Sequence, residues 1–145
     1  MGKLKTLFLC VGNSCRSQMA EGFARSLKGE LIEPYSAGSR PGQLNPLAVR
    51  AMAEAGVDIS GQAPKHVDVL MGIPFDYVIT LCDEGARDCP IFPGAARKIH
   101  RGFDDPPRLA QNAVNEEDAM SHYRRVRDGI KAFVETLPWS LTGEL

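Results

Sequence analysis

The first thirty residues contain two hydrophobic patterns with different periods. Residues 7–11, Leu-Phe-Leu-Cys-Val, form a short apolar run that Gly12 ends, and such a run is typical of a buried β-strand. From Gln18 onward the apolar residues recur at helical spacing, which predicts an amphipathic helix that ends at Gly29. A tight loop at residues 10–17 therefore joins a predicted strand to a predicted helix.

Strand and helix patterns alternate through the rest of the chain. Further strands are predicted at residues 31–37, 77–81 and 96–100, helices at 46–56 (with Asn45 as N-cap) and 64–71, and a turn at 102–107. Pro34 indicates that the second strand lies at a sheet edge, because proline has no N–H to donate to a neighbouring strand. A last helix starts near Asn115 and is predicted to bury Met120, Tyr123, Val126, Ile130, Phe133 and Leu137.

This alternation predicts an α/β fold built from βαβ units. We expect residues 1–145 to form a single domain with a four-stranded parallel sheet flanked by helices on both faces. In the flavodoxin-like strand order 2-1-3-4, the first and third strands are neighbours, and ligands bind beyond their carboxyl ends. Cys10 and Cys82 each stand at such an end. Adjacent strands lie about 4.8 Å apart, and a disulfide needs Cα atoms about 4.4 to 6.8 Å apart, so modest loop movement would join these two cysteines.

The loop at residues 10–17 has the chemistry of an oxyanion site. Backbone N–H groups at a helix N-terminus and the helix dipole favour a tetrahedral anion, and Arg16 can hold two of its oxygens. The same field stabilises a thiolate at Cys10. Ser17 can either cap the helix or donate its hydroxyl to that sulfur. The alternative is an ordinary buried cysteine beside a surface arginine, but Cys-x5-Arg-Ser between a strand and a helix favours the oxyanion site.

Composition narrows the classes of function. A net charge of −1 leaves no broad basic surface for nucleic acid. The longest apolar run is too short to cross a bilayer, and no long apolar segment of a secretory signal is found, so we expect a cytoplasmic protein without membrane contact. Four cysteines in a reducing compartment are more often catalytic, redox-active or metal-binding than structural. A four-cysteine zinc site is disfavoured, because one ligand would have to be the thiol beside Arg16.

Several short motifs together carry a family resemblance. They are the run CVGNSCRSQMAEG at residues 10–22, Thr80-Leu81-Cys82, Cys89-Pro90 and Gly102-Phe103-Asp104-Asp105-Pro106. With these motifs the chain resembles the thioredoxin-coupled arsenate reductases, which are relatives of the low-molecular-weight protein tyrosine phosphatases. The resemblance covers nearly the whole chain. Both groups share the Cys-x5-Arg-Ser loop, and the spaced pair Cys82 and Cys89 is what the reductases add.

The resemblance implies a relay of three cysteines. Cys10 would attack the arsenic of bound arsenate while Asp105 protonates the departing oxygen. Cys82 would then attack Cys10 and release arsenite, and Cys89 would attack Cys82, leaving a disulfide for thioredoxin to reduce. The oxyanion would be held by Gly12, Asn13, Ser14, Cys15, Arg16 and Ser17. We expect no cofactor and no metal site in this chain, and we expect a monomer with arsenate and thioredoxin as its partners.

The last exchange of this relay makes a structural demand on residues 82–89. A regular helix rises about 1.5 Å per residue and would hold the two Cα atoms roughly 10 Å apart, too far for a disulfide. We therefore expect this segment to be coiled or helical in the reduced protein and to unwind or loop out on oxidation. Gly85 is the residue at which we expect the backbone to change conformation most easily.

Some loop and turn residues have a plainer interpretation beside the catalytic one. Cys15 has no step in the relay, so a packing or loop-shaping role is favoured. Asp105 would otherwise be a turn residue before proline, and Asp104 is its rival for the role of acid. Asn13 is expected to hold the loop in shape through side-chain hydrogen bonds.

One position departs from the family pattern. Some reductases of this family bind potassium near the equivalents of Asn13, Glu21 and Ser36, with an acidic residue where this chain has Lys65. An ammonium group at this position would fill the place of the ion.

Two other functions remain open at this point. Arsenate and phosphate share charge and shape, so the loop alone does not separate a reductase from a phosphatase of phosphotyrosine or small phosphoesters. Tyrosine phosphatases usually follow their acid Asp-Pro with an aromatic residue, whereas here Pro107 follows Pro106. A non-catalytic redox sensor that uses the later cysteine pair would leave Arg16 and Asp105 without a role.

Overall fold

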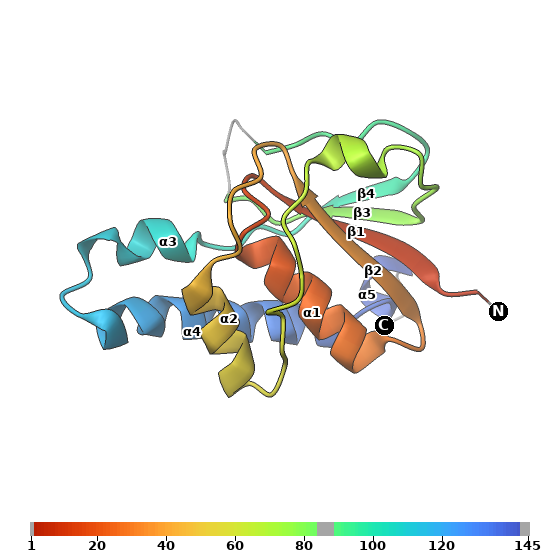
Figure 1. The fold of residues 1–145 in the computed structure, drawn as a ribbon. Helices are drawn as coiled ribbons and strands as arrows, with labels where there is room; N and C mark the ends of the chain where they lie inside the picture. Colours follow the sequence, from red (N-terminus) through yellow and green to blue (C-terminus); the bar gives the residue numbers. More distant parts are fainter. Residues whose placement is uncertain (1, 84–88, 143–145) are drawn as a thin grey trace.

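Four parallel strands form the centre of the molecule, and the computed structural model describes residues 2–83 and 89–142 (Figure 1). The strands are β1 (Leu4–Cys10), β2 (Ile32–Gly38), β3 (Tyr77–Thr80) and β4 (Arg97–His100). The α-helices are α1 (Arg16–Lys28), α2 (Pro46–Glu54), α3 (Pro106–Leu109), α4 (Glu116–Glu135) and α5 (Trp139–Thr142), with 3-10 helices η1 (Val67–Leu70) and η2 (Ala110–Asn112). The strand order β2-β1-β3-β4 confirms the predicted fold class and order.

The pairing of β1 with β3 places two cysteines at one edge of the sheet. Leu9 pairs with Thr80, and the N–H of Leu81 donates to the carbonyl of Leu9 at 2.8 Å. Cys10 directly follows Leu9, and Cys82 directly follows Leu81. Both therefore lie at the carboxyl edge of the sheet, where parallel α/β folds bind their ligands. The outermost position of β2 agrees with the expectation drawn from Pro34.

The sheet separates two apolar cores. Phe8 of β1 packs into the larger core with residues of α1, α2 and α4, whereas Leu7 and Leu9 point to the opposite face. That second core contains Val67 and Leu70 of η1 together with aromatic side chains from the flanking loops. Helices thus lie on both sides of the sheet, with the three longest on one side and η1 on the other (Figure 1).

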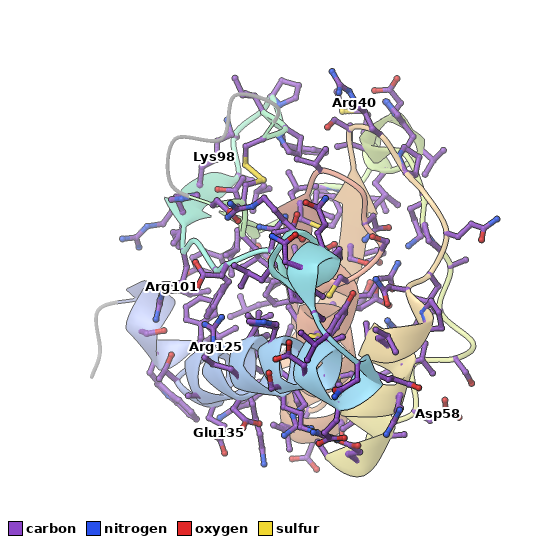
Figure 2. The ribbon with its side chains drawn as sticks, turned by 90° about the vertical axis from the view of Figure 1, so that its left-hand side faces the viewer. Arg40, Asp58, Lys98, Arg101, Arg125 and Glu135 are labelled. Carbon is purple, nitrogen blue, oxygen red and sulfur yellow. A yellow bond between two sulfur atoms is a disulfide. The ribbon has the colours of Figure 1, made fainter. Side chains whose placement is uncertain are left out.

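Charged side chains such as Asp58, Arg101 and Glu135 project from the outside of the ribbon (Figure 2). Within residues 2–83 and 89–142, no helix has the length and apolar character needed to cross a membrane.

Three segments differ from the sequence-based expectation. The predicted turn at 102–107 is irregular only up to Asp105, because Pro106 begins α3, and η2 follows. The predicted helix at 64–71 is reduced to the 3-10 helix η1. Within α4, Phe133 is only partly buried because it packs at the rim of the core against Phe103, with ring centroids 6.2 Å apart. The buried residue next to it is Val134.

Candidate active site

Residues 10–17, called the oxyanion loop below, lie over the N-terminus of α1. β1 ends at Cys10 and α1 begins at Arg16, so the loop gathers the unpaired N–H groups of the helix start. The loop also passes close to the end of β2. A Cβ atom at Gly38 would collide with the carbonyl of Val11, so the close approach requires glycine at position 38.

Asn13 fixes the shape of the oxyanion loop, as expected from the sequence. Its φ angle of +49° lies in the left-handed region. Its amide Nδ2 donates to Ser17 Oγ at 2.8 Å, and its Oδ1 accepts from the backbone N–H of Lys65 at 3.0 Å. Its carbonyl accepts from Gln18 Nε2 at 2.9 Å. These bonds hold a backbone conformation that a side chain other than asparagine adopts rarely.

The thiol of Cys10 is buried and contacts Ser17. Its exposed fraction is 3%, and Sγ lies 2.8 Å from Ser17 Oγ. The N-cap residue of α1 is Cys15, and no side chain caps this helix. Ser17 therefore turns toward the sulfur, which decides between the two roles that the sequence left open. Because Asn13 donates to Ser17 Oγ, the hydroxyl hydrogen is available to stabilise a thiolate at Cys10.

Arg16 is a buried residue of the site and is not a surface charge. It is 7% exposed, and its Nη1 donates to Asp83 Oδ1 at 2.5 Å and to the carbonyl of Phe103 at 3.0 Å. Its Nη2 lies 3.7 Å from Asp105 Oδ1. The guanidinium thus stands at the N-terminus of α1, with carboxylates from two other segments beside it.

The two adjacent aspartates of the Gly-Phe-Asp-Asp-Pro motif point to different partners. Asp104 is 59% exposed and pairs with Arg125 of α4 at 3.1 Å. Asp105 precedes α3, does not cap it through its side chain, and directs its carboxylate to Arg16. Only Asp105 of this pair therefore lies where it could exchange a proton with an anion held by Arg16.

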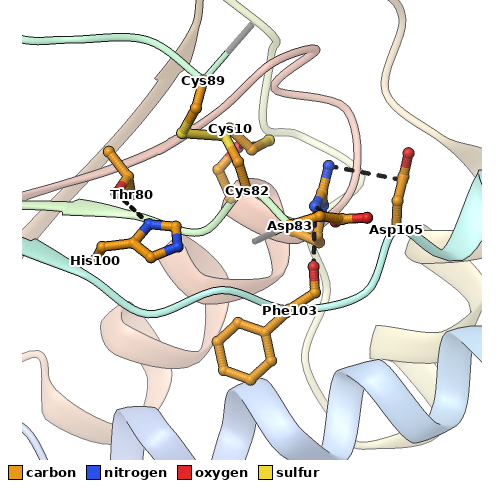
Figure 3. The surroundings of a disulfide bond; sticks show 10 residues. Cys10, Thr80, Cys82, Asp83, Cys89, His100, Phe103 and Asp105 are labelled. Atoms are coloured by element: carbon orange, nitrogen blue, oxygen red, sulfur yellow. Dashed lines mark hydrogen bonds and ion pairs between the residues drawn. A yellow bond between two sulfur atoms is a disulfide. The ribbon is translucent and has the colours of Figure 1, made fainter. Parts of the chain in front are cut away.

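Cys82 and Cys89 form a disulfide with a Cα–Cα distance of 5.8 Å (Figure 3). This distance lies within the range of about 4.4 to 6.8 Å that disulfides require. The expected change of conformation between the two cysteines falls on residues 84–88, which lie outside the described residues. Gly85, where the backbone is expected to bend, is one of these residues.

The other two cysteines, Cys10 and Cys15, are free thiols. Cys15 belongs to the larger apolar core, and burial, with a smaller contribution from Cys10, raises the pKa of its thiol well above the ordinary value. A neutral, buried thiol suits the packing role expected for it. Over the part of the chain that the structure describes, no group of three or more His, Cys, Asp or Glu side chains has the arrangement of a metal site.

Lys65 places its ammonium group beside the oxyanion loop. Nζ donates to the carbonyl of Ser36 at 3.0 Å, and the hydroxyl of Ser36 donates to Glu21 Oε1 at 2.5 Å. Burial lowers the pKa of Lys65, and the nearby charge of Glu21 opposes that shift. The ammonium group of Lys65 is therefore held at Ser36, close to the charge of Glu21.

Two connections of the site are not evident from the sequence. One is the contact of Asp83 with Arg16, for which the only signal is that Asp83 follows Cys82. The other runs through Asn45, whose N–H donates to the carbonyl of Ser14 at 3.0 Å and whose Nδ2 donates to the hydroxyl of Tyr123 at 2.9 Å. Asn45 thereby ties the oxyanion loop to α2 and α4.

Comparison with known proteins gives consistent results. Residues 5–144 match the family described as low molecular weight phosphotyrosine protein phosphatase. An arsenate reductase of Bacillus licheniformis is 46% identical over 140 residues, which cover 94% of this chain and 99% of that protein.

Solved structures show the same likeness. An arsenate reductase in the phosphate binding state has a TM-score of 0.77 and 34% identity, covering 92% of this chain and 95% of its own. A thioredoxin-dependent arsenate reductase of Corynebacterium glutamicum has a TM-score of 0.68 and 27% identity, covering 99% of this chain and 64% of its own.

Proposed function

Because the chain belongs to the low molecular weight phosphotyrosine protein phosphatase family, in the group that includes the bacterial arsenate reductases, we propose that it reduces arsenate to arsenite. The observation that carries the proposal is the combination of two features at one edge of the sheet. An oxyanion loop with a buried thiol and a buried guanidinium lies beside a cysteine pair able to form a disulfide. Hydrolysis of a phosphoester would use the first feature and leave the second without a role.

In the proposed first step, the Cys10 thiolate attacks the arsenic of arsenate. The N–H groups of the oxyanion loop and Arg16 hold the negative oxygens, and Asp105 gives its proton to the oxygen that leaves as water. The burial of Arg16 supports this role, since a charged donor is most effective in a site of low dielectric. The product of this step is a Cys10–arsenic(V) adduct.

In the proposed second and third steps, cysteine thiolates supply the two electrons that reduce arsenic(V) to arsenite. The Cys82 thiolate attacks Cys10 Sγ, the sulfur–arsenic bond breaks, and its electrons stay on arsenic, which leaves as arsenite. The Cys89 thiolate then attacks Cys82 Sγ and frees the Cys10 thiolate. The structure, with Cys82 bonded to Cys89 and Cys10 free, has the arrangement expected at the end of this sequence.

We propose a dithiol protein of the thioredoxin type as the reductant of the Cys82–Cys89 disulfide. Cys89 borders a groove of about 320 Å³ whose apolar lining includes Val78, Pro90 and Phe92. Ile91, which lies between Pro90 and Phe92 in the chain, is 85% exposed. An apolar surface beside a disulfide suits an apolar loop of a partner protein, and one structural relative is named as thioredoxin-dependent. The proposal places the reaction in the cytoplasm, where such reductants keep thiols reduced.

The decisive assay measures NADPH oxidation with thioredoxin and thioredoxin reductase. We expect oxidation to depend on arsenate and to be absent when phosphate replaces arsenate. A Cys89→Ser variant should release about one arsenite per chain and stop with a Cys10–Cys82 disulfide, identified by peptide mass mapping. Multiple turnovers by Cys89→Ser, or no arsenate dependence in the wild-type protein, would contradict the proposal.

The second candidate is a phosphatase, favoured by the family match and by the shared oxyanion loop. Its first step would use Cys10, Arg16 and Asp105 in the same way on a phosphoester. The residue after Pro106 is Pro107, which continues α3 in place of an aromatic residue that would line a phosphotyrosine cleft. Hydrolysis of p-nitrophenyl phosphate that exceeds arsenate reduction in kcat/KM would favour this candidate.

A further inference from the structure

The carboxylate of Asp83 accepts a hydrogen bond from Arg16, whose guanidinium binds the oxyanion in the proposed reaction. Arg16 Nη1 carries two hydrogens, and its two acceptors are Asp83 Oδ1 at 2.5 Å and the carbonyl of Phe103 at 3.0 Å. This nitrogen is therefore fully used within the protein. An anion that is to be held by both terminal nitrogens of Arg16 has to displace one of these two acceptors, and of the two only Asp83 is a charged side chain.

A second arginine fixes Asp83 in this position. Arg108 Nη2 donates to Asp83 Oδ2 at 2.7 Å, so the carboxylate bridges two guanidinium groups through its two oxygens. The side chain of Asp83 is only 24% exposed, whereas that of Arg108 is 58% exposed. Arg108 contributes no contact to Arg16 itself, so its effect is to hold the carboxylate in place and limit its exchange with a solvent anion.

The position of Asp83 in the chain links this contact to the state of the cysteines. Asp83 follows Cys82, and consecutive Cα atoms are about 3.8 Å apart, so Asp83 moves whenever Cys82 moves. In the structure, Cys82 is bonded to Cys89 while Asp83 contacts Arg16 (Figure 3). The proposed relay requires Cys82 to approach Cys10 before this disulfide forms, which changes the position of its neighbour.

We propose that Asp83 is an internal competitor of the oxyanion for Arg16, and that closure of the Cys82–Cys89 disulfide strengthens this competition. The inference rests on the assignment of the oxyanion loop under the proposed function. Its consequence is that the oxidised protein binds arsenate or phosphate weakly. Arsenate then enters the site only after the reductant has restored the thiols that complete its reduction.

The test measures the affinity for inorganic phosphate by isothermal titration calorimetry in a phosphate-free buffer. Wild-type, Asp83→Asn, Asp83→Ala and Asp104→Asn proteins are each compared in the reduced form and in the Cys82–Cys89 disulfide form. Asp104→Asn removes the same charge from an exposed residue that contacts Arg125 and not Arg16, so it controls for net charge. The alanine variant controls for an asparagine that still accepts from Arg16.

In the wild-type protein we expect phosphate to bind the disulfide form roughly tenfold more weakly than the reduced form, the size of one close charge contact. In both Asp83 variants the disulfide form should regain most of this tenfold loss in phosphate affinity. The phosphate affinity of the reduced form should change much less. Asp104→Asn should keep the wild-type difference between the two forms.

Three outcomes would overturn the inference. The first is a disulfide form of both Asp83 variants that binds phosphate no more tightly than the wild type. The second is an equal gain in the reduced and disulfide forms, and the third is an Asp104→Asn protein that behaves like the Asp83 variants. Failure of the reduced wild-type protein to bind phosphate at all would instead overturn the assignment of the oxyanion loop, and the inference with it.

Discussion

Single neighbouring atoms determine the chemistry of the reactive groups in this site. Ser17 Oγ lies 2.8 Å from Cys10 Sγ, and Asp105 Oδ1 lies 3.7 Å from Arg16 Nη2. Both contacts involve groups that are charged during the proposed reaction, where one hydrogen bond or ion pair has a large effect on rate. Substitutions that remove one polar atom therefore test these roles directly.

Ser17→Ala is expected to slow the alkylation of Cys10 by iodoacetamide roughly tenfold at neutral pH, because the thiolate loses a hydroxyl donor. The rate is measured on reduced protein by mass spectrometry of the peptide that contains Cys10. Ser121→Ala, which removes the hydroxyl of an exposed serine in α4, should leave the rate unchanged. Equal rates in Ser17→Ala and wild type would show that the hydroxyl does not stabilise the sulfur.

Asp105→Asn is expected to lower kcat for arsenate reduction roughly 100-fold, the usual contribution of a general acid. The adjacent Asp104→Asn is its matched control, because it makes the same change in a side chain that points to Arg125. NADPH oxidation in the coupled thioredoxin assay gives both values. If Asp104→Asn caused the larger loss, the assignment of the acid would be reversed.

At this scale the spacing of residues indicated which groups form the candidate site but not which groups surround them. Cys10 and Arg16 follow from Cys-x5-Arg-Ser between a strand and a helix. The partners of Arg16 come from positions 67 and 87 residues away, and no local pattern indicates such contacts. The role of Ser17 was decided only by the structure, in which Ser17 Oγ contacts Cys10 Sγ and accepts from Asn13 Nδ2.

At the scale of elements, helix ends connect the site to the rest of the fold. Asn45 caps α2 by accepting from the N–H groups of Leu47 at 2.8 Å and Ala48 at 3.2 Å. Its other amide atom donates to Tyr123 of α4, and its backbone N–H holds the oxyanion loop at Ser14. One residue therefore connects the start of α2, the middle of α4 and the oxyanion loop.

Asn45→Ala should lower the free energy of unfolding by about 1–2 kcal/mol, because two helix N–H groups and the Tyr123 hydroxyl lose a partner. Asn115→Ala removes the simpler cap of α4, a single bond to the N–H of Asp118 at 2.8 Å, and should cost about 1 kcal/mol or less. Urea unfolding followed by circular dichroism measures both. A larger loss in Asn115→Ala would contradict the role given to Asn45.

The starts of α2 and α4, which have asparagine caps, were predictable, and the shorter helices were not. Asn45-Pro46 and Asn115 followed by acidic residues are local signals for a helix start, and both are caps in the structure. α3 begins at Pro106 without a side-chain cap and lasts one turn. A segment rich in proline and aspartate is equally typical of a turn. Only the packing of α3 against α4 favours the helix here.

At the scale of the whole molecule, the parallel sheet brings together parts of the site that are far apart in the chain. The alternation of strands and helices predicted a parallel sheet, and the flavodoxin-like order that goes with such a sheet predicted that Cys10 and Cys82 lie at one edge. For the Cys82–Cys89 pair, the sequence yielded only the distance that a disulfide requires between the two Cα atoms. The bonding state of this pair depends on redox conditions, which no hydrophobic pattern encodes.

Closing and opening the Cys82–Cys89 disulfide should change backbone amide signals at residues 82–92 and at Arg16 and Arg108, because Asp83 contacts both arginines. Amides within α2 and the buried face of α4 should stay unchanged. Two-dimensional NMR of the reduced and oxidised protein tests this, with Cys89→Ser as the variant that cannot close the bond. Unchanged signals at residues 82–92 would contradict a conformational switch.

The carbonyl-to-glycine approach between Val11 and Gly38 has a practical consequence for engineering this protein. A methyl group added at position 38 would meet the carbonyl of Val11 and, at 2.9 Å, the backbone nitrogen of Asn13, so the loop would have to shift. Such a variant would keep every charged side chain of the candidate site, which makes it a negative control in which the shape of the loop is what differs.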